Sequence, residues 1–205
     1  MFCPLCQNKS TNFFKDIYFK CTCCKAIFKK PDLHLKGKDE KNIYDKHVNI
    51  STDIKYQNFL SPITNSVLND FDSNTKGLDF GSGKDSAIIK VLRDKSYNIA
   101  AYDIFYKNDK KLLEEKYDYI TSSEVIEHFQ NPKKEFELLL SMLKKDAALY
   151  LMTEIYNENI DFEKWYYKND PTHIFLYQKE TFLWIKENYG FKKLIIEKRL
   201  IKLYS

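Results

Sequence analysis

The stretch from residue 77 to residue 103 constrains the fold of this chain more than any other part. Residues 77–80 are mostly apolar and predict a short strand that ends at Gly81-Ser82-Gly83. Residues 84–95 have a helical pattern, and residues 98–103 predict a second strand that ends in an acid. Two glycines at a strand end let a ligand approach the backbone closely. This order predicts two neighbouring parallel strands with a ligand site at their carboxyl ends.

The alternation of strands and helices continues to the end of the chain. Further strands are predicted at 117–122, 147–152 and 191–204, and further helices at 132–145 and 179–189. The first of these helices should have proline in its first turn and lysines in its last turn, a common arrangement at helix ends. The alternation predicts an α/β fold, a Rossmann-like doubly wound and mainly parallel sheet over residues 76–205.

A helix is also predicted before the sheet, at residues 51–70. Ser51-Thr52-Asp53 offers side chains that cap a helix N-terminus. The apolar residues that follow recur at roughly helical spacing. Pro62 interrupts this pattern, so we expect it to kink or restart the helix.

The glycine loop departs from two nucleotide-binding patterns. A triphosphate loop needs four residues between its glycines, whereas Gly77 and Gly83 are separated by five. Asp85 stands where that loop has a magnesium-binding hydroxyl, and its carboxylate would repel phosphate. The dinucleotide pattern fails as well, because Ser86 replaces the third glycine. Neither a triphosphate nor a nicotinamide or flavin site is expected.

The remaining pattern is a strand, an acid, and two glycines that open a helix. Asp103 follows twenty residues after Gly83, at the end of the next strand, where it can accept hydrogen bonds from both ribose hydroxyls. "GLDFGSG" and "AAYD" resemble the first two motifs of the class I S-adenosylmethionine-dependent methyltransferases. "YDYITSSEVIEHFQNP" (117–132) and "WYYKNDPTHIFLYQKETFLWI" (165–185) resemble later segments of the quinone O-methyltransferases and their neighbours. The resemblance covers about residues 76–190.

The resemblance implies S-adenosylmethionine as the cofactor and a set of residues that bind it. These are Asp79, Phe80, Gly81, Ser82, Gly83, Asp103, Ile104, Ser122 and Glu124. Lys84-Asp85 departs from the family, in which a small residue or proline often follows the second glycine. Residues 104–116 are too few for the usual helix, strand and adenine-contacting loop, so we expect the third strand to be missing or vestigial.

All five cysteines lie in the first 24 residues. Cys3 and Cys6 form one C-x2-C pair, and Cys21 and Cys24 form another after fourteen residues, with Cys23 left over. Two such pairs can complete a tetrahedral zinc shell with no open position. The spacing therefore predicts a structural Zn²⁺ held by Cys3, Cys6, Cys21 and Cys24 in a small zinc-ribbon-like module. N-terminal zinc-binding cysteine pairs also occur before domains of the family that the chain resembles.

Two histidines are the candidate catalytic residues. His128 follows Glu124 and Glu127 at spacings that would put all three on one helix face. In some quinone O-methyltransferases the E-x-x-E-H pattern implies a divalent metal or a histidine base. His173 lies after the predicted fifth strand, where substrate should enter. Each histidine could instead stabilise only its local structure.

Weaker candidates surround these two histidines. Trp165-Tyr166-Tyr167 could line a substrate pocket or simply pack in the core, and His47 could reach the site from the N-terminal segment.

The charge distribution suggests an alternative partner for the N-terminal part of the chain. Residues 1–50 carry ten lysines and five acids, so their net charge is +5, while the whole chain has +4. A basic N-terminal quarter suits either a solvated surface or an acidic partner such as RNA.

The domains expected are a zinc module at 1–30, a connector and lid helix at 31–75, and the Rossmann-like domain at 76–205. No apolar run is long enough for a membrane span. We see no signal peptide, and therefore expect a cytoplasmic protein with neither DNA nor a membrane as partner.

The sequence thus favours a methyltransferase that acts on the oxygen, carbon or nitrogen of a small molecule. An RNA methyltransferase that uses the basic module is one alternative. A non-catalytic binding protein that keeps the fold as a scaffold is the other.

Overall fold

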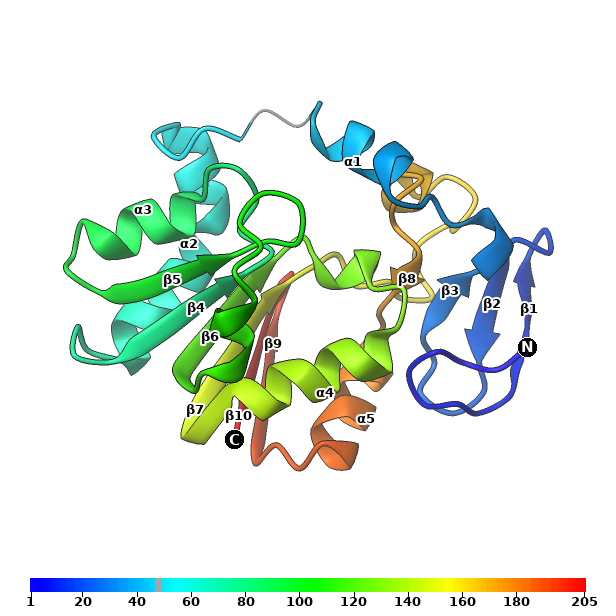
Figure 1. Ribbon diagram of the computed structural model, residues 1–205. Helices are drawn as coiled ribbons and strands as arrows, with labels where there is room; N and C mark the ends of the chain where they lie inside the picture. The colour runs from blue at the N-terminus through cyan, green and yellow to red at the C-terminus, as the bar shows by residue number, and fades with distance from the viewer. Residues whose placement is uncertain (47–48) are drawn as a thin grey trace.

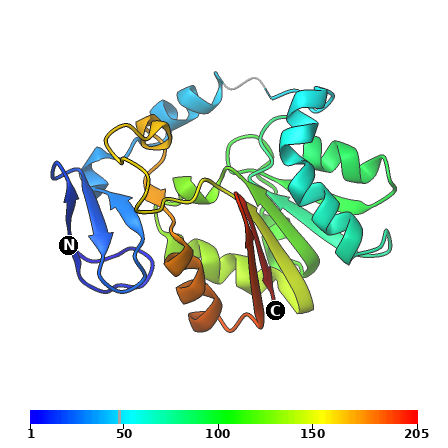
Figure 2. The same ribbon diagram turned by 180° about the vertical axis from the view of Figure 1, so that it is seen from behind.

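The computed structural model describes residues 1–46 and 49–205. Two sheets organise this part of the chain. A small antiparallel sheet lies at one end of the molecule, and a six-stranded sheet with its helices forms the rest, as Figures 1 and 2 show from opposite sides.

The main sheet has the strand order β5-β4-β6-β7-β10-β9. Strands β4, β5, β6 and β7 run parallel, and β10 is antiparallel to both of its neighbours. The bounds are Lys76–Phe80 for β4, Asn98–Tyr102 for β5, Tyr117–Ser123 for β6, Leu143–Met152 for β7, Lys193–Glu197 for β9 and Leu200–Tyr204 for β10. The predicted mainly parallel α/β fold is confirmed.

The missing third strand is also confirmed. Strand β5 is an edge of the main sheet, and the chain between β5 and β6 forms only the 3-10 helix η2, Lys110–Glu114. No strand of the described residues covers this edge.

Helices cover both faces of the sheet, because its central strands are apolar on both sides. Helices α2 (Ile54–Asp70) and α3 (Ala87–Arg93) pack on one face, with Tyr150 and Met152 of β7. Helices α4 (Pro132–Met142) and α5 (Lys179–Asn188) pack on the other, with the alternate residues Leu149 and Leu151. Successive residues of β7 therefore belong to two separate cores.

Two local predictions need correction. Helix α2 is continuous through Pro62, and the Ser61 hydroxyl donates to the Asn58 carbonyl at 2.7 Å, which is the acceptor left by the missing proline N–H. Helix α4 ends at Met142 rather than at residue 145, so the predicted lysines are not in its last turn. Strand β7 starts directly at Leu143, which pairs with Tyr117 of β6.

The small sheet has the order β1-β2-β3-β8. Its strands are β1 (Ser10–Phe14), β2 (Tyr18–Cys21), β3 (Ile27–Lys29) and β8 (Phe175–Leu176). Three strands come from the cysteine-rich segment, but β8 comes from the chain between β7 and α5. Phe28 pairs with Phe175. The cysteine-rich segment is therefore joined to the rest of the fold by backbone hydrogen bonds as well as by packing.

The connector runs from the small sheet to α2. It contains a 3-10 helix, η1 (Pro31–Leu33), and the helix α1 (Lys38–Tyr44), and Figure 1 shows α1 at the top of the molecule. Two further 3-10 helices, η3 (Ile126–His128) and η4 (Tyr166–Asn169), follow β6 and β7. Among the described residues, no helix is both long and apolar enough to cross a membrane.

Candidate functional site

A cavity of about 1260 Å³ opens at the carboxyl ends of β4, β5 and β6. Its walls are the glycine loop, the loops after β5 and β6, parts of the connector and of α2, the segment 166–173 and Arg199. In open parallel sheets, ligands bind at this edge. The volume exceeds the roughly 300–1,000 Å³ typical of one small-molecule pocket, so two ligands can share it.

The glycine loop has a backbone that requires glycine at Gly81. Its φ is +79°, and an added Cβ would lie 2.4 Å from a methyl carbon of Val125. Gly83 has φ +63° with nothing within 4 Å of an added Cβ, so its surroundings are open. The Gly81 and Ser82 amides both donate to the Tyr102 carbonyl, at 2.8 and 3.0 Å. This anchors the loop to the end of β5.

Asp103 organises the wall beside this loop. Its carboxylate accepts from the Gly83 amide at 2.9 Å and from the Phe105 and Tyr106 amides at 2.8 and 3.1 Å. A carboxylate has about four acceptor positions, so capacity remains for a ligand hydroxyl. Ile104 is 63% exposed and lines the cavity next to it, where it offers an apolar contact for a flat ring.

Lys84 and Asp85, the residues that depart from the family pattern, bind the connector. Lys84 Nζ lies 2.8 Å from Asp45 Oδ1, and the Tyr106 hydroxyl donates to the same carboxylate at 2.8 Å. Asp85 accepts from the Ser51 amide at 2.8 Å. Both charges therefore hold the N-terminal segment over the cavity, and neither is arranged for phosphate.

Two of the predicted cofactor residues lie behind the cavity wall. Asp79 is buried and accepts from the Ser86 and Thr121 hydroxyls at 2.6 and 2.8 Å. Burial raises the pKa of Asp79 to about 6. Ser122 is fully buried and does not line the cavity. Phe80, Gly81, Ser82, Gly83, Asp103, Ile104 and Glu124 do line it.

The predicted helix face with Glu124, Glu127 and His128 does not form. Glu124 has φ +53°, and its amide donates to the Met152 carbonyl at 2.8 Å, so the helix η3 begins only at residue 126. The two glutamates instead meet at the hydroxyl of Tyr167, which contacts both carboxylates. Burial, and then the neighbouring Glu127, raise the pKa of Glu124 to about 7.

Arg199 compensates the charge of Glu124 and lines the cavity. Its guanidinium reaches Glu124 Oε2 and Glu154 Oε2, both at 2.5 Å. It comes from the turn between β9 and β10, far from every motif. The only available signal is that the sequence has just two arginines.

His128 and His173 lie side by side, although 44 residues separate them in the sequence. Their ring centroids are 4.9 Å apart. His128 Nδ1 lies 2.9 Å from the Thr172 carbonyl oxygen, and His173 Nδ1 lies 2.7 Å from the Tyr167 carbonyl oxygen. Each Nδ1 therefore carries the proton that it donates, and the Nε2 of a neutral ring then carries a lone pair. Burial lowers the pKa of His173, which favours this neutral form.

The weaker candidates lie in different parts of the molecule. Tyr166 and Tyr167 line the cavity, whereas Trp165 packs with Phe162 in a separate apolar cluster. His47 lies outside the described residues.

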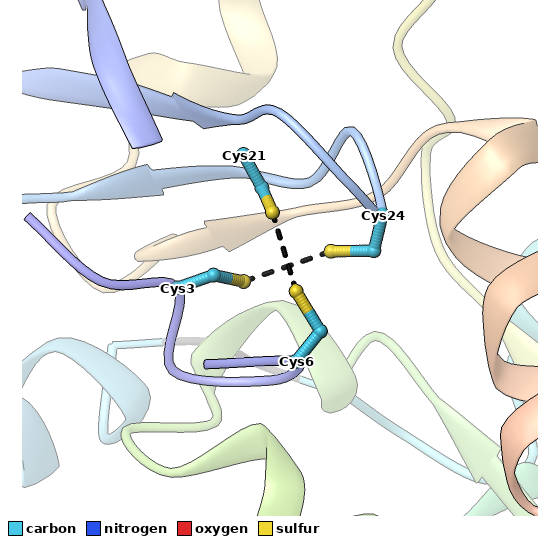
Figure 3. A group of neighbouring side chains, drawn as sticks. All are labelled: Cys3, Cys6, Cys21 and Cys24. Atoms are coloured by element: carbon cyan, nitrogen blue, oxygen red, sulfur yellow. Dashed lines mark hydrogen bonds between the residues drawn. The ribbon is translucent and has the colours of Figure 1, made fainter. Parts of the chain in front are cut away.

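The four predicted zinc ligands converge, as Figure 3 shows. Cys3 Sγ lies 3.6 Å from Cys24 Sγ, and Cys6 Sγ lies 3.3 Å from Cys21 Sγ. Zn–S bonds of about 2.3 Å in a tetrahedron place sulfurs about 3.8 Å apart, so the arrangement fits a zinc ion. The contact with Cys24 lowers the pKa of Cys3 to about 6, whereas burial raises that of Cys21 to about 11. Only a cation makes four neighbouring thiolates stable.

Known proteins supply a comparison for this geometry. Residues 53–195 match the family model described as "Methyltransferase domain". No curated protein matches the chain. A SAM-dependent methyltransferase from Archaeoglobus fulgidus has a similar structure, with a TM-score of 0.55 and 20% identity over 69% of this chain and 72% of that one.

Two more solved structures share the fold. An O-methyltransferase family protein from Burkholderia thailandensis has a TM-score of 0.52 and 10% identity over 92% of this chain and 79% of its own. The human N-acetylserotonin methyltransferase, solved with SAM, has a TM-score of 0.52 and 14% identity over 73% of this chain and 53% of its own.

Proposed function

The chain belongs to the family of methyltransferase domains and has the fold of SAM-dependent methyltransferases, and from this premise we propose that it methylates a small molecule at the His128–His173 end of the cavity. The family places it among enzymes rather than non-catalytic scaffolds. The observation that carries the proposal is one continuous cavity, lined by the glycine loop and Asp103 as well as by both histidines.

The residues of the glycine-loop side suit S-adenosylmethionine. Asp103 has acceptor capacity for a ribose hydroxyl, and Ile104 and Phe105 offer apolar surface for a base. The open space beside Gly83 lets a ligand lie against the backbone. When bound, this cofactor supplies an electrophilic methyl group on a sulfonium. The protein must then hold an acceptor in line with it and help the acceptor lose a proton.

The acceptor side has the groups for that task. His128 and His173 line the cavity, with Nδ1 of each held by a backbone carbonyl. Tyr44 and Tyr166 add aromatic surface to the same cavity, which suits a small organic molecule. We assign His128 and His173 as the residues that face and activate the acceptor.

The charges of the cavity favour a neutral or cationic acceptor over RNA. Seven carboxylates line it, those of Glu40, Asp45, Asp85, Asp103, Glu124, Glu135 and Asp170. Among the described lining residues, Lys84 and Arg199 are the only lysine and arginine, and carboxylates bind both. A phosphate backbone would find repulsion here rather than a counter-charge.

We also propose that Cys3, Cys6, Cys21 and Cys24 hold a structural zinc ion. Four sulfur ligands leave no coordination position for a substrate. The site lies next to the main core: Cys3, Cys21 and Cys24 belong to the same apolar cluster as Phe175 and Phe182. Zinc would therefore stabilise the packing between the small sheet and α5.

The test is transfer of a labelled methyl group. Purified protein is incubated with methyl-labelled S-adenosylmethionine and either the metabolite fraction or the RNA fraction of a cell extract. We expect label in small molecules, and at least a tenfold loss in His173→Asn. His34→Asn is the matched control, since His34 also binds a backbone carbonyl but lies outside the cavity. Label confined to RNA would contradict the proposal.

A further inference from the structure

The loop before β8 carries His173 and is held by the cysteine-rich segment. Strand β3 of that segment pairs with β8, as Figure 1 shows. Next to this pairing, Lys29 of β3 donates twice to the loop. Its ammonium donates to the Pro171 carbonyl at 3.1 Å, and its amide donates to the Ile174 carbonyl at 2.8 Å. The two hydrogen bonds hold the backbone on both sides of His173.

We propose that Lys29 is a positioning residue for the acceptor site, which fixes the backbone around His173 and thereby the direction of its ring. The inference rests on the methyltransferase function proposed above. Lys29 does not line the large cavity, whereas His173 does. Lys29 therefore acts through the loop and does not touch the acceptor.

The ring of His173 is fixed relative to its own loop by local contacts. Its Nδ1 donates to the Tyr167 carbonyl at 2.7 Å, and its amide donates to the Asp170 carbonyl at 3.2 Å. The Asp170 carboxylate accepts from the amide and the hydroxyl of Thr172. All of these bonds lie within residues 167–173. Contacts from outside the loop must therefore fix its place relative to the cavity, and Lys29 supplies two of them.

The buried ammonium of Lys29 is unfavourable for stability by itself. Lys29 is only 8% exposed, and burial lowers its pKa despite the opposing effect of the Asp170 carboxylate. Among the described residues, no carboxylate forms an ion pair with this ammonium, and the acceptor of its hydrogen bond is a neutral carbonyl. A buried charge without a paired counter-charge destabilises a fold. Such departures from stable packing occur at functional sites, which favours a role for Lys29 in the acceptor loop.

Tyr18 of β2 supports the same loop at its other end. It pairs with Lys29 in the small sheet, and the Lys29 ammonium lies 5.8 Å from the centre of its ring. The Tyr18 hydroxyl donates to the Lys168 carbonyl at 3.0 Å. Lys168 directly follows Tyr167, whose carbonyl binds the ring of His173. Two neighbouring side chains of the small sheet therefore hold the start and the end of the loop.

The principal experiment compares Lys29→Met with Lys20→Met. Methionine keeps the length of the side chain and removes the ammonium. Lys20 is the matched control, because it lies in β2 and its ammonium pairs with Glu158 rather than with the loop. The assay uses methyl-labelled S-adenosylmethionine and the metabolite fraction of a cell extract. We expect Lys29→Met to lose at least about tenfold in methyl transfer, and Lys20→Met to lose none. Both should keep the affinity of wild type for S-adenosylmethionine, because neither side chain lines the cavity.

The ring nitrogens of His173 give a readout that stabilisation alone would not change. With ¹⁵N-labelled histidine, and with His173→Asn to assign the signals, wild type should carry the ring proton at Nδ1, as the bond to Tyr167 requires. In Lys29→Met with a native circular dichroism spectrum, the proton should divide between Nδ1 and Nε2, because the loop no longer maintains that bond. Unchanged methyl transfer, or an unchanged tautomer of His173, would overturn the proposal. Wild type that transfers no methyl group would contradict the proposed function, whereas the tautomer would still test the role of Lys29.

Tyr18→Phe tests the same loop with a smaller change and decides the matter if Lys29→Met does not fold. Its matched control is Tyr156→Phe. Tyr156 lies in the same apolar cluster, and its hydroxyl also donates to a backbone carbonyl, that of Ile160, at 3.2 Å and outside the loop. We expect Tyr18→Phe to lower methyl transfer about fivefold, as the loss of one neutral hydrogen bond implies, and Tyr156→Phe to leave it unchanged. Equal methyl transfer in the two variants would overturn the proposal.

Discussion

The buried carboxyl of Asp79 predicts a pH dependence of stability with a definite sign. Burial raises the pKa of Asp79 from 3.8 to about 6 in the folded protein. The folded state therefore holds the proton more tightly than the unfolded state. This contribution to stability is complete below pH 3.8 and is lost as the pH rises through about 6.

The size of the effect follows from the shift. Roughly two pKa units correspond to about 3 kcal/mol in total, at 1.36 kcal/mol per unit. About 1.4 kcal/mol of this falls between pH 5 and pH 8, the range in which the folded group ionises and the unfolded group stays ionised. Asp79→Asn removes the titration, so its stability relative to wild type should rise by that amount from pH 5 to pH 8.

The assay is urea unfolding at pH 5, 6, 7 and 8, followed by circular dichroism. Asp118→Asn is the matched control. Burial raises the pKa of Asp118, but the Lys144 ammonium and the Lys76 amide outweigh it, so the net shift is downward. A lowered pKa matters only below about pH 4, and the Asp118→Asn difference should be flat over this range. An Asp79→Asn difference that is equally flat would refute the reasoning.

Three further predictions concern packing, metal and the connector. Gly77→Ala puts a Cβ 2.2 Å from the Tyr119 ring, so the free energy of unfolding measured in urea should fall by about 1–3 kcal/mol or more. Tyr119→Leu should restore part of this stability. An unchanged free energy of unfolding in Gly77→Ala would contradict the close packing of Gly77 against Tyr119. Cys24→Ser should reduce the zinc content found by metal analysis. It should also lower the melting temperature of the whole chain, because Cys24 belongs to the main apolar cluster. An unchanged melting temperature would show that the cysteine module does not contribute to the stability of the main domain. Lys84→Ala removes the ion pair with Asp45 and keeps the Lys41–Asp45 pair within α1. Backbone amides of α1 should then exchange faster with deuterium, while those of α2 do not. Equal protection in α1 would mean that the ion pair does not hold the connector.

The sequence predicted the parts of the fold that depend on short-range patterns. Cys3, Cys6, Cys21 and Cys24 were recognisable because each pair forms one tight turn. The glycine loop was recognisable because Gly81 occupies a backbone conformation that few other residues adopt. The missing strand followed from the short connection between β5 and β6.

Features that depend on tertiary contacts were harder to predict. The helix face expected for Glu124, Glu127 and His128 is wrong, because Glu124 adopts a left-handed conformation and its amide bonds to β7. Strand β8 has two residues, too few for a periodic signal, and pairs with β3 across some 147 residues of sequence. Arg199 lies in a hairpin turn, and only the packed structure brings it to the cavity.

The two histidines combine features that local sequence predicts with features that only tertiary contacts determine. Both were candidates from their local sequence context, but nothing in their spacing indicated that they adjoin. The segment after β7 returns Thr172 and His173 to η3, where the Ile174 amide donates to the Glu127 carbonyl at 2.9 Å. That backbone contact sets the geometry of the proposed acceptor site.

Calorimetric titration of S-adenosylmethionine into the zinc-loaded protein tests the central claim most directly. We expect micromolar affinity, about −8 kcal/mol, and at least a tenfold loss in Asp103→Ala. Asp109→Ala should leave the affinity unchanged, since Asp109 caps η2 outside the cavity. The absence of binding by wild type, or equal affinity in Asp103→Ala, would contradict the assignment of this cavity as the cofactor site.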